Sequence, residues 1–216
     1  MSSTRASHAG QAYWSRLARS YDRSMLLLGR PMPRTIELTT AELQGAGDVL
    51  EVAAGTGLLT LPVARVARRV VATDYSDGMI GVLQQRVREA GLTNVECSQR
   101  DVYALGLPPA SFDAVLCANV LHLLPDLPSA LAALKAVLRP GGKLVAPTFC
   151  HAQTRLSRAF SRLMALTGFP GERRLSSRTL SDALESAGFQ VTRQQTVPGL
   201  IPMGFVVGVA PALPSA

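Results

Sequence analysis

The chain has 216 residues, of which 47% are hydrophobic and 17% are charged, a balance that is typical of one folded globular domain. It has no apolar run of the roughly 18 residues that a membrane-spanning helix needs, and its first residues lack the apolar core of a secretory signal. We therefore expect a cytoplasmic protein with a single domain over residues 1–216. The three cysteines are scattered without a CxxC pair, so we expect neither a disulfide framework nor a metal site.

The net charge of +7 is concentrated in two segments. Residues 1–34 carry +5 and residues 151–174 carry +4, whereas the rest of the chain sums to −2. On a helical projection, residues 14–30 and 153–166 each place arginines on one side and apolar side chains on the other. The sequence therefore predicts two basic amphipathic helices. We do not expect nucleic-acid binding, because one Trp and four Tyr are too few to interleave a basic patch with aromatic side chains.

From residue 48 onward, apolar runs alternate with segments of helical period, which predicts a parallel sheet with helices on both faces. Glycine or Pro-Gly-Gly marks the end of two of these helical segments. The strands predicted in this part are 48–53, 69–73, 94–99, 112–118 and 143–148. The helices predicted between them are 58–67, 77–90 and 127–138.

After Thr148 the pattern changes. The basic helical stretch leads to a Gly/Pro turn, and a further helix starts near Ser177 and ends at Gly188. Two strands follow, at 189–196 and 201–209, and the short Pro-Gly turn between them predicts an antiparallel hairpin. The predicted fold class is therefore α/β, a doubly wound and mostly parallel seven-stranded sheet, Rossmann-like, whose last strand runs antiparallel.

Two glycines stand in the loop that follows the first predicted strand. Gly55 and Gly57 allow the backbone to bend sharply and to approach a ligand closely, while the next helix offers free N–H groups at its start. Ligands of doubly wound sheets bind beyond the carboxyl ends of the strands. The loop therefore predicts a nucleotide-like ligand, and the alternative is a turn that uses glycine for its geometry alone.

Acidic residues follow the next two strands. Asp74 ends the second strand, where a carboxylate can accept hydrogen bonds from both hydroxyls of a ribose. Asp101 follows the third strand and is suitably placed to bond the exocyclic amine of an adenine. Together with the glycine loop, these residues predict a nucleoside site. The alternative is that both acids cap local turns.

The motif differs from a dinucleotide site. The usual pattern GxGxxG has a third glycine, which is missing from GTGLLT at residues 55–60. Short-chain dehydrogenases also need a tyrosine four residues before a lysine, but Leu131 precedes Lys135 and Arg139 precedes Lys143 at that distance. An NAD-dependent oxidoreductase is therefore the less favoured interpretation.

Several motifs together, in order over about residues 12–210, resemble the class I S-adenosylmethionine-dependent methyltransferases. The resemblance implies an enzyme that transfers a methyl group from S-adenosylmethionine to a small-molecule or lipid-like acceptor and leaves S-adenosylhomocysteine. Ala53 departs from the family pattern, since it stands at the first glycine position. The motifs are EVAAGTG at 51–57, Asp74 with Ser76 and Met79 behind it, Asp101, FDAV at 112–115, LHLLPD at 121–126 and LRPGG at 138–142.

The resemblance implies contacts at the methionine end of the cofactor. This part of the cofactor is expected to lie against the loop of Ala53, Gly55 and Gly57. Glu51 is expected to orient its ammonium group, and Asn119, just after the fourth strand, is expected to face the same end.

The resemblance also implies contacts with the adenosine. Asp74 is expected to hold the ribose, and Tyr75 and Met79 to enclose the adenine between them. Asp101 and the backbone amide of Val102 are expected to read the adenine edge. For Met79, the alternative is ordinary core packing at helical spacing.

The acceptor side is predicted less directly. His122 lies where some related O-methyltransferases have a catalytic histidine, so it is the candidate general base, with orientation of the following loop as the alternative. His151 is a second residue that we expect to project toward the acceptor. The resemblance further implies lid segments at 1–34 and 151–175, with Tyr21 touching the carboxylate of the cofactor.

The charge of these lid segments bears on the partner. A concentration of +9 around the entrance favours an anionic acceptor, or peripheral contact with an anionic membrane at its inner face. The alternative is that both basic helices present ordinary solvated faces. A protein that binds S-adenosylmethionine without transferring its methyl group also stays open as an alternative.

Overall fold

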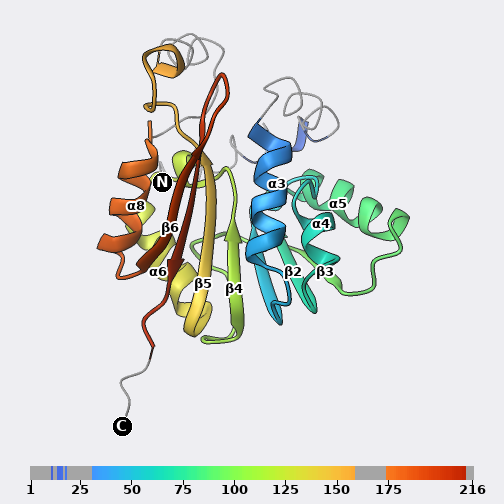
Figure 1. Ribbon diagram of the computed structural model, residues 1–216. Coiled ribbons are helices and arrows are strands. Elements are labelled where there is room, and N and C mark those ends of the chain that lie inside the picture. Colours follow the sequence, from blue (N-terminus) through green and yellow to red (C-terminus); the bar gives the residue numbers. More distant parts are fainter. Residues whose placement is uncertain (1–10, 12–13, 17, 19–30, 159–173, 213–216) are drawn as a thin grey trace, which may run out of the picture.

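The computed structural model describes residues 11, 14–16, 18, 31–158 and 174–212, and within them the chain forms one seven-stranded sheet (Figure 1). The strand order is β3-β2-β1-β4-β5-β7-β6. Only β7 runs antiparallel to its neighbours, β5 and β6, so the predicted architecture is confirmed. The strands are β1 (Asp48–Val52), β2 (Arg69–Asp74), β3 (Val95–Gln99), β4 (Phe112–Cys117), β5 (Leu138–Phe149), β6 (Gln190–Val197) and β7 (Met203–Val209).

Helices cover both faces of the sheet. On one face, α3 (Pro31–Glu42), α4 (Thr60–Ala64) and α5 (Asp77–Glu89) pack on a hydrophobic cluster. On the other face, α6 (Leu127–Val137) and α8 (Ser177–Ser186) pack on a second cluster. Both faces are therefore buried, which explains why the central strands are apolar almost throughout.

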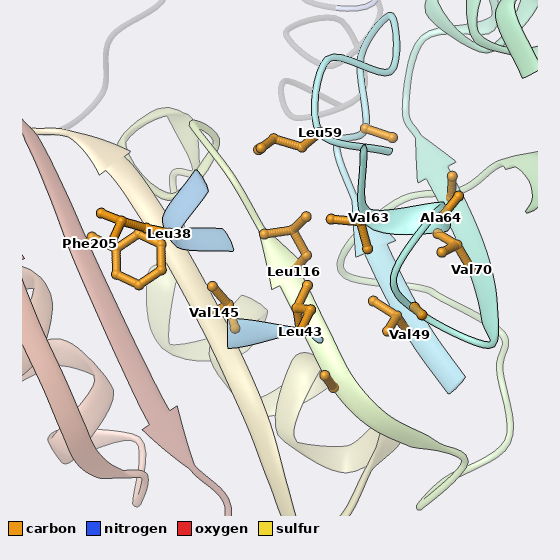
Figure 2. Close-up of a cluster of buried hydrophobic side chains, with 14 of the residues drawn as sticks. Leu38, Leu43, Val49, Leu59, Val63, Ala64, Val70, Leu116, Val145 and Phe205 are labelled. Atoms are coloured by element: carbon orange, nitrogen blue, oxygen red, sulfur yellow. The ribbon is translucent and has the colours of Figure 1, made fainter. Parts of the chain in front are cut away.

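The first cluster shows how separate parts of the chain meet across the sheet. Figure 2 shows Leu38 of α3 beside Phe205 of β7, while Val63 of α4 lies close to Val49 of β1. These side chains are all at most 4% exposed. Burial of each such side chain contributes about 1.5–3 kcal/mol. The cluster therefore fixes the end of the sheet from which the loops emerge.

Helix α3 was not predicted from the sequence. Its buried face carries two hydroxyl side chains, Thr35 and Thr39, which are fully buried and hide the apolar period. Thr35 Oγ1 lies 2.8 Å from the Pro31 carbonyl oxygen and 2.9 Å from Met203 Sδ. The hydroxyl of Thr35 is thus accommodated inside the core by backbone and sulfur acceptors.

Other predicted elements differ at their ends. Helix α4 spans five residues instead of the predicted 58–67, because turns and a bend occupy residues 55–59 and a further turn follows at residues 65 and 66. Strand β5 begins at Leu138, directly after α6, and not at residue 143. The Pro-Gly-Gly sequence does stop the helix, but the chain continues extended, and Leu138 pairs with Phe112 of β4.

Most of the predicted lid segments fall outside the described residues. None of the helices in the described part is both long and apolar enough to cross a membrane. Of the segment 1–34, the structure places residues 11, 14–16, 18 and 31–34, and of the segment 151–175 it places 151–158, 174 and 175.

Candidate functional site

The predicted site residues gather at the carboxyl ends of β1, β2, β3 and β4. Strands β2 and β3 lie on one side of β1 and β4 and β5 lie on the other, so the strand order reverses between β1 and β4. Loops leave in opposite directions at such a point, which opens space for a ligand. The fold therefore brings the glycine loop, Asp74, Asp101 and Asn119 to one end of the sheet, as the sequence predicted.

The loop after β1 has an unusual backbone. Ala53, Gly55 and Gly57 have φ angles of +52°, +57° and +93°, in the left-handed region. A Cβ on Gly57 would stand 2.6 Å from Leu83 Cδ1 and 2.7 Å from Leu61 Cδ1, side-chain ends that would have to move, so the left-handed φ is the stronger reason for glycine there. Ala53 has no such freedom, and a non-glycine residue in this region costs about 1–2 kcal/mol. The conformation explains why the family pattern has glycine at that position.

Asp74 is held in place by backbone amides. Its carboxylate is 9% exposed and accepts hydrogen bonds from the N–H of Gly55, at 2.8 Å, and from the N–H of Ser76, also at 2.8 Å. Burial raises the pKa of Asp74, and these amides partly offset the effect. The backbone amide of Tyr75 also acts on this carboxylate. A carboxylate has about four lone-pair sites, so acceptor capacity remains for a ribose hydroxyl.

Glu51 is a buried carboxyl group whose hydrogen bonds are incomplete. It is 2% exposed, and Oε2 has no hydrogen-bond partner among the described residues. Burial raises the pKa of Glu51 to about 8, the Thr60 hydroxyl opposes that rise, and the charge of Asp74 adds to it. A buried carboxyl in this state is stabilised by the arrival of a cation. The residue therefore fits the ammonium group that the sequence assigned to it.

Asn119 has matching features on the neighbouring strand. It follows β4 with a φ of +55°, and its Oδ1 also has no hydrogen-bond partner within the described part of the chain. Its N–H bonds to the Pro147 carbonyl oxygen at 2.8 Å, which ties the ends of β4 and β5 together. Two unsatisfied acceptor oxygens, of Glu51 and Asn119, thus lie at the ends of paired strands. This donor-seeking pair fits the methionine end of S-adenosylmethionine.

The residues predicted to contact the adenine have less distinctive surroundings. Asp101 Oδ1 accepts a hydrogen bond from the N–H of Tyr103 at 2.9 Å, so the predicted turn cap is real. Because Asp74 pairs with Gln99, Asp101 and Val102 follow close beside the end of β2. Met79 is 2% exposed and belongs to the buried hydrophobic core, so ordinary core packing accounts for its burial. Tyr75 is half-buried directly after β2.

Two histidines meet on the acceptor side. His122 lies in η1 (Leu121–Leu123) after β4, and His151 follows β5, with ring centroids 5.4 Å apart and ring planes tilted by 41°. They are 2% and 5% exposed. Burial lowers the pKa of His122 to about 3, with a further contribution from His151, and burial together with the charge of Arg174 lowers the pKa of His151. Both rings are therefore neutral near pH 7.

The sequence named these histidines separately and did not predict their pairing. The signal was available, since β4 and β5 are neighbouring strands and each histidine lies a few residues beyond the end of its strand. Tyr21, the remaining predicted site residue, lies outside the described residues.

Comparison with known proteins places this arrangement in context. Residues 50–146 match a model of the methyltransferase domain family. A ubiquinone/menaquinone biosynthesis C-methyltransferase from Teredinibacter turnerae is 30% identical over 209 residues, which are 85% of this chain and 84% of that protein. A ubiquinone biosynthesis O-methyltransferase from Xanthomonas axonopodis pv. citri is 36% identical over 118 residues, 54% of this chain and 49% of that protein.

A solved structure has the same fold. Magnesium protoporphyrin IX methyltransferase from Synechocystis PCC 6803, determined with bound S-adenosylhomocysteine, matches with a TM-score of 0.73 at 19% identity. The match covers 94% of this chain and 98% of that one.

Proposed function

The chain belongs to the class I S-adenosylmethionine-dependent methyltransferases, and from this premise we propose that its acceptor is a hydroxylated aromatic ring of the quinone-precursor class, methylated on carbon. The enzyme transfers the methyl group to a small-molecule or lipid-like acceptor. The similarity to a quinone C-methyltransferase extends over most of both chains, whereas the similarity to a quinone O-methyltransferase covers about half of each. That long match, together with further C-methyltransferases among the similar proteins, supports carbon over oxygen.

We further propose how this chain holds its cofactor. Glu51 binds the ammonium group, Asn119 accepts a hydrogen bond from the methionine end, and Asp74 binds the ribose with its remaining acceptor capacity. When bound, S-adenosylmethionine supplies an electrophilic methyl group on a sulfonium centre. The chain itself must then orient the acceptor and exclude water.

His122 is proposed to act on the hydroxyl of the acceptor. A phenolic ring attacks through carbon more readily when its hydroxyl oxygen bears negative charge, and a neutral imidazole can withdraw the hydroxyl proton. As the ring C–CH3 bond forms and the S–CH3 bond breaks, the ring carbon would release its hydrogen as a proton and the oxygen would take its own proton back, which restores the aromatic hydroxyl. Burial disfavours the imidazolium form of His122. The ring therefore holds a second proton only when an anionic oxygen lies beside it. The second neutral ring, His151, lies beside His122, with ring centroids 5.4 Å apart.

We also propose peripheral contact with anionic lipid, next to the acceptor side. Leu156 is 63% exposed between the exposed residues Arg155 and Arg158, and Leu200 is 43% exposed in the β6–β7 turn. Both segments lie at the end of the sheet where the site is (Figure 1). Exposed leucines flanked by arginines suit the boundary of an anionic membrane, where a lipid-like acceptor resides. Equal recovery of the protein by flotation with neutral and anionic vesicles at low salt would contradict this contact.

Incubation with methyl-labelled S-adenosylmethionine and a prenylated hydroquinone tests the acceptor class. We expect label on a ring carbon, located by mass spectrometry and nuclear magnetic resonance. Label on oxygen would contradict the proposed atom. Binding of S-adenosylhomocysteine in calorimetry without product from any quinol would contradict the acceptor class and favour a different substrate.

A further inference from the structure

The N-terminal part of the chain touches the start of helix α5 beside the proposed ribose site. Ser15 Oγ lies 2.8 Å from Ser76 Oγ and donates a hydrogen bond to Asp77 Oδ1 at 2.9 Å. Ser76 is the N-cap of α5, and its hydroxyl also accepts the N–H of Met79 at 3.2 Å. Ser15 therefore binds the same residue that caps the helix.

Gly78 makes this contact possible. A Cβ at Gly78 would stand 2.9 Å from both Cα and Cβ of Ser15 and 3.2 Å from its carbonyl oxygen. Two of these three atoms are backbone, so no change of side-chain rotamer can relieve the overlap. The N-terminal segment, residues 14–16, approaches α5 at Gly78, the one residue in the first turn of the helix that has no side chain.

The helix itself has no need of glycine at this position. Gly78 lies within α5, its φ is not in the left-handed region, and alanine is a better helix former than glycine. Gly81, one turn further along the same helix, has no atom within 4 Å of its Cβ position. The two glycines therefore share a helix and differ in what a methyl group would meet.

We propose that Gly78 and Ser15 form a docking seat that couples the N-terminal segment to cofactor binding. This inference rests on the proposed ribose site at Asp74. The N–H of Ser76 bonds to Asp74 Oδ1, and the N–H of Gly55 bonds to Asp74 Oδ2. Docking at Ser76 thus fixes the residue that orients the Asp74 carboxylate. Gly78 is a positioning residue, since it acts through the segment that it admits.

Trp14 provides a direct probe of docking. It is the one tryptophan of the chain, it is half-buried, and it precedes Ser15. Emission maximum and acrylamide quenching would be measured for the wild type, Gly78→Ala and Gly81→Ala, each with and without S-adenosylhomocysteine. We expect Gly78→Ala to have red-shifted and more quenchable Trp14 emission, while Gly81→Ala resembles the wild type.

Calorimetry on the same three proteins tests the coupling. We expect Gly78→Ala to bind S-adenosylhomocysteine about fivefold to tenfold more weakly, in proportion to the loss of two hydrogen bonds, while Gly81→Ala stays within about twofold of the wild type. Ser15→Ala removes the same hydrogen bonds without adding a methyl group to the helix. It is expected to change both readouts in the same direction as Gly78→Ala.

The outcomes distinguish the docking contact at Gly78 from the proposed ribose site at Asp74. If Trp14 quenching and S-adenosylhomocysteine affinity are the same in Gly78→Ala and Gly81→Ala, the proposed docking contact is wrong, whether or not the cofactor binds. If Trp14 differs between these two variants but the wild type binds no S-adenosylhomocysteine, the docking contact stands and the coupling fails with the proposed site.

Discussion

Strand β1 carries a carboxylate near each end, Asp48 and Glu51, and the two carboxylates have different surroundings. At the amino end, Asp48 lies 2.6 Å from Arg68 Nη2 and 3.2 Å from Arg139 Nη2. Asp113 of β4 accepts the N–H of Asp48 at 2.7 Å and pairs with Arg139. Burial acts to raise the pKa of Asp113, but the hydrogen bonds from Arg139 and Asp48 outweigh it and lower the pKa.

At the carboxyl end, the acids have no such partners. Among the described residues, no arginine or lysine pairs with Glu51 or Asp74, and burial raises the pKa of both. Ala53 and Asn119, at the ends of β1 and β4, carry strained backbones. The amino end is complete as folded, whereas the buried acids of the carboxyl end have no cationic partner in the described part of the chain. We therefore propose that the amino ends of these strands serve stability and the carboxyl ends serve ligand binding.

The largest expected effect is the pH dependence that Glu51 gives to the ligand-free protein. Its pKa is raised from 4.5 to about 8 on folding, so the folded state binds the proton more tightly than the unfolded state. The stabilisation is complete below pH 4.5 and is lost as pH rises toward 8, by at most about 1.4 kcal/mol per pH unit. Urea unfolding from pH 5.5 to 8 should show this decline in the wild type and a flatter profile in Glu51→Gln. Parallel profiles would contradict the assignment.

Replacement of His122 tests the acceptor side. We expect His122→Ala to lower kcat by about 100-fold, the lower range for a general base, with S-adenosylhomocysteine affinity unchanged. Because the pKa of His122 is lowered to about 3, its protonation should cause no loss of activity between pH 5 and 8. A kcat for His122→Ala within a few-fold of the wild type would remove its proposed role. A titration of activity near pH 6.5 that disappears in the variant would contradict the neutral histidine pair.

A matched pair of substitutions compares the two ends directly. Asp74→Asn removes a charged acceptor from the ribose site, and we expect S-adenosylhomocysteine to bind about 10-fold to 50-fold more weakly, with little change in melting temperature. Asp113→Asn should leave this affinity unchanged and lower stability by no more than about 1 kcal/mol, since its pair with Arg139 is half-exposed. Calorimetry and thermal unfolding of both variants measure the contrast. A loss of affinity in Asp113→Asn as large as in Asp74→Asn would refute it.

The smallest expected effect is relief of backbone strain. Ala53→Gly should stabilise the protein by about 1 kcal/mol, because glycine adopts a φ of +52° without the steric cost that alanine bears. This corresponds to a rise of about 2–4 °C in melting temperature. Ala54→Gly is the control, since its neighbouring φ is not in the left-handed region, and it should destabilise. Destabilisation by both substitutions would show that residue 53 is not strained.

Sequence patterns predicted the parts of the fold that repeat. The alternation of apolar runs and helical segments predicted the strands of the parallel part of the sheet, because its buried central strands have a strong and local signal. The antiparallel β7 was predicted from the short Pro-Gly turn that precedes it. Helix α3 was missed because Thr35 and Thr39 occupy its buried face, where an apolar period is expected. The extra length of β5 was missed because Pro-Gly-Gly marks a helix end but does not reveal that an extended strand begins at Leu138.

The sequence predicted that the candidate residues would share one end of the sheet, but it did not predict the protonation or backbone strain of these residues there. Glycines and acids after strands indicate where a nucleoside binds, because strand ends of one sheet share an edge. The neutral pairing of His122 and His151 depends on burial and on neighbouring strands, which no single motif encodes. Likewise, the sequence showed that Ala53 replaces a glycine, but only the backbone angle shows that this replacement is strained.

Proton release on ligand binding tests most directly whether Glu51, at the carboxyl end of β1, binds a cation. Titration of the wild type with S-adenosylhomocysteine at pH 7, in two buffers of different ionisation enthalpy, counts the protons released. Because Glu51 must lose its proton to meet the ammonium group, we predict release approaching one proton for the wild type and for Asp113→Asn, and almost none for Glu51→Gln. Equal proton release and equal affinity in the wild type and Glu51→Gln would contradict the assignment of Glu51 and, with it, the division of roles between the two ends of the sheet.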